Sequence, residues 1–196
     1  MKTLALAAAC ALVAAPVLAQ TTAPSGPSAQ PPSAASPDTT PSPSPRPSNP
    51  STSGAAAPSA ADFATKVAIS DMFEIQSSEL ARQKGDKSEK PFARRMIHDH
   101  TQTTAQLKKL VSDGKVQAQL PTALDSEHQQ MLDDLKGKTG KDFDRAYNDA
   151  QKKGHEDAVA LFTAYAQNGD NPALKQWASK TLPHLKEHLR MANELK

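Results

Sequence analysis

The amino-acid sequence predicts an all-helical protein: a four-helix bundle that follows an N-terminal segment without a core of its own. Beyond residue 61, apolar residues recur at spacings of three and four, which is the period of an amphipathic α-helix. Strict alternation of apolar and polar residues, which indicates a strand, is not found in the sequence. Residues 20–60 consist mainly of Pro, Ser, Thr and Ala and offer little apolar surface for burial.

Residues 1–19, MKTLALAAACALVAAPVLA, have the order of a secretory signal peptide: a lysine, a short apolar run and a small residue at the end. We therefore expect cleavage after Ala19 and a periplasmic or secreted protein. Cys10 raises a lipoprotein as the alternative, but only alanines directly precede it and the apolar run continues past it. Cleavage after Ala19 removes this only cysteine and leaves the mature chain without a transmembrane segment.

Residues 20–60 are expected to form a disordered Pro/Ser/Ala-rich linker, and residues 61–196 are expected to form the folded domain. A linker of this kind suits a domain that is held near a cell wall or a membrane, so we expect a partner in the envelope. Nucleic acid is not expected as a partner, because the net charge is only +2 and the basic residues are scattered without aromatic neighbours. The sequence does not indicate the oligomeric state.

The first two helices of the domain are predicted at residues 62–84 and 88–112. Asp62 and Ser88 are the expected N-caps, and a glycine follows each expected end. The inward stripe of the first helix holds Phe63, Val67, Ser70, Glu74 and Ser77. The inward stripe of the second helix holds Phe92, Met96, His100, Thr103 and Leu107. The helical period therefore places His100 on the buried face and His98 on the solvated face.

Two further long helices are predicted at residues 141–167 and 172–194, after a short helix at residues 125–136. The stripe of the helix at 141–167 contains Phe143, Tyr147, Gly154, Ala158, Leu161 and Tyr165, and His155 is expected at its edge. Asn171 is the expected N-cap of the last helix. In that helix His188 lies on the flank of the apolar stripe and His184 lies further out. Pro183 is expected to kink it.

The lengths of the connections favour a ferritin-like order of these helices. The first two long helices and the last two are joined by tight turns, whereas a long crossover with its own short helix separates the two pairs. At 1.5 Å per residue, Glu74 and His100 lie about 18 and 21 Å from the first turn. Because the crossover returns the chain to that same end, the third long helix begins there, and His155 lies about 21 Å along it. The last helix returns from the far end, which puts His184 near that level and His188 about one turn beyond it.

Each long helix thus brings a residue that can bind a metal ion to the middle of the bundle. We predict a site for a divalent transition metal (Zn, Fe, Cu or Mn) formed by Glu74, His100, His155 and His188, with His184 as an alternative ligand. The competing interpretation is that these are separate buried polar residues, each satisfied by a backbone carbonyl or by water.

Catalysis is the least supported of the functions considered. A ferritin-type di-iron site needs Glu-x-x-His on two helices, but Ile97, Lys152 and Leu185 stand three residues before the three histidines. The sequence contains no Ser-His-Asp arrangement, phosphate-binding glycine loop or zinc-protease motif. We therefore predict no catalytic residues. Two other classes remain open: metal binding linked to stress protection, and a structural or interaction module of the envelope without a metal.

A set of short motifs links the folded part to a known family. They are Glu74, Asp99-His100-Thr101, Phe143-Asp144-x-x-Tyr147, His155-Glu156, and Thr181-Leu182-Pro183 followed by His188. In these motifs, over about residues 61–195, the chain resembles the exported bacterial proteins catalogued as domain of unknown function 4142, some of which are labelled outer-membrane proteins. The resemblance implies a ferritin-like helical bundle in the bacterial envelope and supplies no established activity.

Overall fold

The computed structural model describes residues 57–196, which form five α-helices and, within that range, no strand. The helices are α1 (Ala60–Lys84), α2 (Glu89–Ser112), α3 (Ser126–Gly137), α4 (Gly140–Asn168) and α5 (Pro172–Ala192). Every helix boundary lies within two residues of its prediction, so the all-helical class is confirmed for this part of the chain. The expected signal peptide and residues 20–56 of the expected linker lie outside the described residues.

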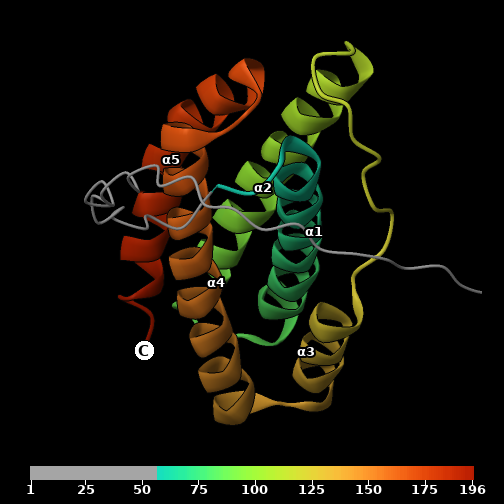
Figure 1. Ribbon diagram of the computed structural model, residues 1–196. Coiled ribbons are helices and arrows are strands. Elements are labelled where there is room, and N and C mark those ends of the chain that lie inside the picture. Colours follow the sequence, from blue (N-terminus) through green and yellow to red (C-terminus); the bar gives the residue numbers. More distant parts are fainter. Residues whose placement is uncertain (1–56) are drawn as a thin grey trace, which may run out of the picture. The chain divides into compact units, whose positions relative to one another are not determined.

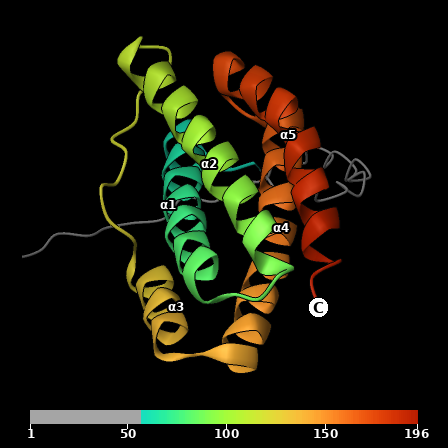
Figure 2. The same cartoon turned by 180° about the vertical axis from the view of Figure 1, so that it is seen from behind.

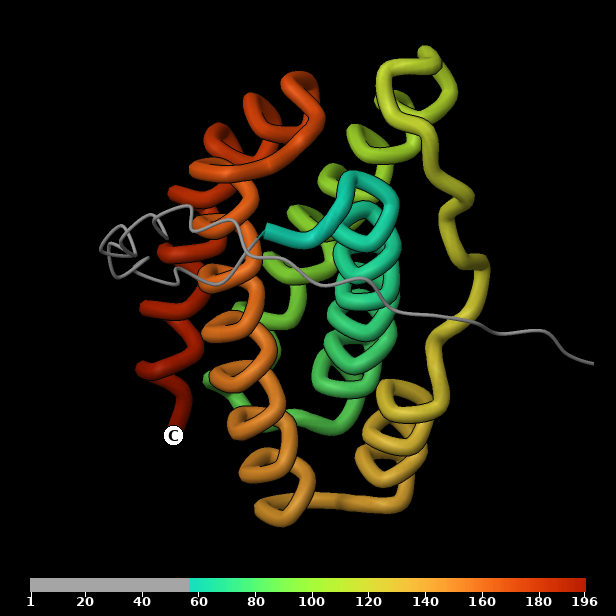
Figure 3. The backbone as a smooth tube through the Cα atoms, viewed as in Figure 1, coloured from blue at the N-terminus to red at the C-terminus, as the bar shows by residue number. Residues whose placement is uncertain are grey.

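The long helices form two antiparallel pairs, α1 with α2 and α4 with α5, as Figures 1 and 2 show. From the end of α2, the chain runs back through residues 113–125 and reaches α3 near the α1–α2 turn. Helix α4 therefore starts near that turn and runs in the same direction as α2 (Figure 3). Helix α1 packs against α2, α3 and α4, and α5 packs against α4 and α2. The four long helices thus share one interior.

Two of the expected N-caps differ from those in the structure. Helix α1 begins at Ala60, and the Ser59 hydroxyl accepts a hydrogen bond from the Asp62 amide at 3.2 Å, so Ser59 is the cap rather than Asp62. The Ser88 side chain makes no capping bond at the start of α2. Instead, the Asp86 carboxylate accepts a hydrogen bond from the Ser88 amide at 2.6 Å. Because Ala60 also packs against the core, the folded part starts before residue 61.

The remaining caps and the proline of α5 follow the sequence more closely. The Asp125 and Asn171 side chains cap α3 and α5 by accepting the amides of His128 and Leu174. Helix α5 continues through Pro183, which lies on its exposed side. No helix in residues 57–196 combines the length and the apolar composition that are needed to cross a bilayer.

The core consists of two apolar clusters, one toward each end of the long helices. The first is built around Phe63, Phe162, Tyr165 and Trp177. The second is built around Phe73, Phe92, Phe143 and Tyr147. Each long helix contributes to both clusters and, between its two contributions, carries a buried polar residue: Asp71, His100, His155 or His188. The interior therefore contains a polar layer between two apolar ones.

Candidate metal centre

Three histidines from three helices meet in this polar layer, and we refer to them as the histidine trio. His100 on α2, His155 on α4 and His188 on α5 are only 3%, 1% and 2% exposed. The centroids of their rings lie 5.4 to 5.7 Å apart in all three pairs. Each ring has one nitrogen that lies within 4.8 Å of a nitrogen of both other rings. Three of the four residues predicted as ligands are thus brought together.

Two rings of the trio are anchored from α1 and α4. His100 Nδ1 lies 2.8 Å from Asp71 Oδ1 on α1. His155 Nδ1 lies 2.8 Å from the main-chain oxygen of Gln151, one turn earlier on α4. Carboxylate and carbonyl oxygens accept hydrogen bonds, so Nδ1 carries the hydrogen in both rings. This fixes the orientation of each ring and leaves Nε2 buried without a hydrogen-bond partner.

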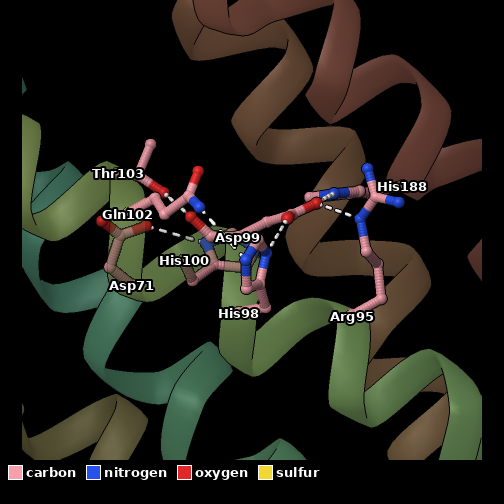
Figure 4. Close-up of polar contacts among 8 residues, drawn as sticks. All are labelled: Asp71, Arg95, His98, Asp99, His100, Gln102, Thr103 and His188. Carbon is pink, nitrogen blue, oxygen red and sulfur yellow. Dashed lines mark hydrogen bonds and ion pairs between the residues drawn. The ribbon is translucent and has the colours of Figure 1, made fainter.

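The third ring is anchored through a carboxylate on α2. His188 Nε2 donates to Asp99 Oδ2 at 2.9 Å, which leaves its other nitrogen, Nδ1, buried and without a partner. Figure 4 shows that the Asp99 carboxylate also accepts hydrogen bonds from Arg95 and His98. Asp99 is therefore an acceptor shared by side chains of α2 and α5. Burial opposes the charge on Asp99, but the hydrogen bonds from Arg95, His98 and His188 outweigh it and hold its pKa below the usual range. Asp99 is therefore ionised when it holds His188.

The second nitrogen of each ring is buried and has no hydrogen-bond partner; these atoms are His100 Nε2, His155 Nε2 and His188 Nδ1. Unpartnered buried polar atoms are uncommon in proteins, because each costs about 1–3 kcal/mol of stability. Here three of them converge from three helices. Anchoring one imidazole nitrogen on an oxygen acceptor while the other remains free is also the arrangement found around histidines that bind metals.

Burial keeps two rings of the trio neutral. Desolvation lowers the pKa of His188 to about 4, against the opposing effect of its hydrogen bond to Asp99. Desolvation also lowers the pKa of His155. Both rings are therefore uncharged at pH 7, which is the form of imidazole that binds metal ions.

The third ring shares a proton with a buried carboxyl group. Burial acts against the charge on His100, but the hydrogen bond and the charge of Asp71 outweigh it and raise the pKa of His100. Burial raises the pKa of Asp71, and the hydroxyl of Thr104 also donates to this carboxylate, at 3.0 Å. A cation bound at Nε2 would replace the second proton of His100 and leave its bond to Asp71 intact.

Glu74, the fourth predicted ligand, borders the trio without joining the group of mutually close atoms. Its side chain is 2% exposed, and Oε2 is buried without a hydrogen-bond partner. A Cβ atom at Gly154 would lie only 3.2 Å from Oε1, so the carboxylate rests against α4 beside His155. Its negative charge acts on both His100 and His155. A carboxylate without a cation thus lies next to the free nitrogens.

His184 and His98 lie outside the trio. His184 is exposed and lines a surface pocket of about 530 Å³ that His188 also borders. His184 does not belong to the group of nitrogens that lie within 4.8 Å of one another. His98 is exposed, which confirms the phase predicted for α2.

The groups that orient the rings were not predicted from the sequence; they are Asp71, Asp99 and the carbonyl of Gln151. Asp71 precedes Glu74 by one helical turn, and this spacing is the signal that could have placed both on one face. His155 was expected at the edge of its stripe, and it is buried because the buried face of α4 extends past it to Asn148. No local pattern distinguishes Asp99, which reaches a partner 89 residues away.

The comparison with protein families agrees with the resemblance noted in the sequence. The family model described as Domain of unknown function (DUF4142) matches residues 45–195. That match starts within the expected linker and spans all five helices. No curated protein and no solved structure matches the chain. The chain belongs to the DUF4142 family.

Proposed function

We propose that this protein binds one divalent transition metal ion through His100 Nε2, His155 Nε2 and His188 Nδ1. The observation that carries the proposal is the convergence of these three nitrogens, which are buried and without partners. Hydrogen bonding alone does not account for them, because no acceptor or donor within residues 57–196 meets them. A metal ion satisfies all three at once.

The dimensions of the trio suit such an ion after a small contraction. Two imidazole nitrogens on a tetrahedral zinc ion lie about 3.3 Å apart, given bonds of about 2.0–2.1 Å. One nitrogen of each ring in the trio lies within 4.8 Å of one nitrogen of each other ring. To reach 3.3 Å, the two nitrogens of a pair must therefore approach each other by about 1.5 Å at most. Side-chain rotation of three rings that each keep one hydrogen bond supplies a movement of this size.

Glu74 is our candidate for the fourth position. Its buried, unpartnered Oε2 supports this role, and its negative charge offsets that of a divalent cation. Three imidazoles and one carboxylate suit Zn, Fe, Cu or Mn. Without Glu74 the fourth position would be open to water, as it is in catalytic zinc sites with three histidines.

The surrounding protein, in this proposal, is a ferritin-like four-helix bundle that is exported to the bacterial envelope and protects it under stress by holding the ion. Support for the fold comes from the parallel direction of α2 and α4, which the long crossover with α3 makes necessary. Support for export comes from the signal-peptide pattern of residues 1–19. Mass spectrometry of the mature N-terminus tests the export: a chain that starts at residue 20 agrees with it, and an uncleaved chain contradicts it.

The binding test uses the chain without a histidine tag, freed of metal by a chelator. Zn²⁺, Cu²⁺, Mn²⁺ and Fe²⁺ are added one at a time, and the thermal midpoint and the heat of binding are measured. An ion present at 100 times its dissociation constant stabilises the folded state by about 2.7 kcal/mol, which corresponds to a rise of roughly 10 °C. Replacing any one of His100, His155 or His188 by Ala is expected to abolish most of that rise.

Two histidines outside the trio provide matched controls. His184→Ala removes an exposed imidazole and His128→Ala a half-buried one, and both variants are expected to retain the full response. If no ion raises the midpoint, or if the three buried histidines prove dispensable, the metal proposal fails. The alternative is then a structural or interaction module, in which the anchored rings serve as an internal hydrogen-bond network; the bonds of His100 to Asp71 and of His188 to Asp99 favour that alternative.

A further inference from the structure

We propose a second cation site, separate from the histidine trio, in which Asp86, Glu89 and Asp144 bind a hard divalent cation such as Ca²⁺. The three carboxylates come from the α1–α2 turn, the first turn of α2 and the first turns of α4. This site contains no histidine, so it stands or falls independently of the function proposed above.

The spacing of the carboxylates fits a calcium ion. One oxygen from each of the three lies within 4.8 Å of the other two. Oxygens bound to calcium at about 2.3–2.6 Å are separated by no more than about 5 Å. The three oxygens therefore already lie at distances that one ion can span, without contraction of the site.

The three carboxyl groups have no basic partner. Among residues 57–196, no Lys, Arg or His nitrogen forms an ion pair with Asp86, Glu89 or Asp144. The nearby Lys84 directs its ammonium group elsewhere, to the carbonyl oxygens of Lys136 and Lys138 at 2.6 and 3.2 Å. A cation from solution is the missing counter-charge.

Buried oxygen atoms without partners are a separate observation that points to the same ligand. Glu89 is 0% exposed, no N–H or hydroxyl group donates to its buried Oε2, and one of its carboxyl oxygens lies within 4.8 Å of oxygens of Asp86 and Asp144. Asn148, which is 5% exposed, donates its Nδ2 to Glu89 Oε1 at 3.0 Å and leaves its own Oδ1 unpartnered. Oδ1 of Asp144 is also buried and unpartnered. All three free atoms are oxygen acceptors, the ligand type that hard cations select.

The backbone of the turn brings Glu89 into this position. A Cβ atom on Gly85 would lie 2.6 Å from the Ala81 carbonyl oxygen and 2.8 Å from Glu89 Cβ, so only glycine fits. Asp86 is exposed, which leaves a route for the ion and room for water ligands. Three carboxylates completed by water molecules give the coordination by six to eight oxygens that calcium prefers.

The test adds CaCl₂ to the full chain after treatment with a chelator, and KCl at the same ionic strength serves as the salt control. Sites built from a few carboxylates and water bind calcium with dissociation constants of about 10⁻⁴–10⁻³ M. At roughly 10 mM Ca²⁺ the thermal midpoint is therefore expected to rise by about 5–10 °C. Titration calorimetry should give a dissociation constant in the same range.

Two isosteric variants identify the site, and a third is the matched control. Glu89→Gln keeps the acceptor for Asn148 and removes the charge, so the calcium response should disappear while the calcium-free protein becomes more heat-stable. Asp144→Asn should weaken binding at least tenfold. Asp149→Asn changes an exposed carboxylate on the same helix and should leave the response intact. The proposal is overturned if KCl gives the same rise, if calcium gives none, or if the response survives both Glu89→Gln and Asp144→Asn.

Discussion

His188 on α5 donates its Nε2 hydrogen to Asp99 Oδ2 on α2 across 2.9 Å, and this bond connects the last helix to the first helix pair. It also determines which nitrogen of His188 remains free. Because the ionised carboxylate accepts the hydrogen of Nε2, the lone pair of the neutral ring lies on Nδ1, which is buried and has no partner. Packing between the helices and the proposed metal chemistry therefore depend on the same contact.

Asp99→Ala is expected to weaken metal binding by about 10–100-fold, because the His188 ring loses the acceptor that fixes its orientation. Asp99→Asn retains an oxygen acceptor and should weaken binding less. Titration calorimetry on the metal-free variants measures both effects. Asp157→Ala, which removes an exposed carboxylate from α4, is the control and should bind like the unchanged chain. Equal affinities for Asp99→Ala and Asp157→Ala would mean that the anchor of His188 is irrelevant.

The metal-free protein should lose stability in acid as His188 takes up a proton. Its pKa in the folded chain is about 4, below the ordinary value of 6.5, so the unfolded chain binds more protons between these values. The stabilising contribution is complete above pH 6.5 and is lost as the pH falls to 4, by about 3 kcal/mol in all. Urea unfolding at a series of pH values measures it. His188→Gln should flatten the curve in this window, and an unchanged slope would contradict the assignment.

Gly85→Ala should destabilise the fold by about 1–3 kcal/mol, because the new methyl group meets backbone atoms of Ala81 and the Cβ of Glu89. These atoms belong to well-packed helix ends and have no room to move aside. Gly137→Ala is the matched control, since nothing lies within 4 Å of its added Cβ. Chemical unfolding should show a loss for the first variant only. A comparable loss at Gly137 would point to backbone flexibility as the cause.

Leu107→Ala should cost about 2–5 kcal/mol of stability, since the side chain is 1% exposed within the first apolar cluster. Leu161→Ala should cost clearly less. The sequence put Leu161 in the inward stripe, but it is only partly buried. His98→Ala should be nearly neutral, because this ring lies at the surface. Urea midpoints for the three variants should follow that order, and a reversed order of the two leucines would contradict the observed packing of α4.

The features that depend on one helix at a time were predictable from the sequence. The period of 100° per residue separated His100 from His98, and the turn residues placed every helix boundary within two residues. The level of the three histidines followed from counting along helices of known rise. The cap of α1 was predicted wrongly because Asp62 directly precedes the first apolar residue, Phe63. In the structure, the Ser59 hydroxyl accepts a hydrogen bond from the Asp62 amide and donates one to the Asp62 carboxylate.

The features that depend on how helices rotate against one another were not predictable. Asp71 reaches His100 through the packing of α1 on α2, and Asp99 reaches His188 through the docking of α5 on α2; no single-helix pattern contains either contact. The buried face of α4 is also wider than the expected stripe, so that His155 lies within it. His184, one turn before His188, lies at the surface.

The distribution of the histidine trio over the helix pairs has a kinetic consequence. His100 belongs to the first pair, and His155 and His188 belong to the second. Each pair is built from contacts between segments close in sequence, but the rings meet only after the pairs dock across the long connection. An ion held by all three rings is thus bound late on the folding route and slows unfolding far more than it speeds folding. The longer the ion stays bound to the three rings, the longer the chain therefore stays folded.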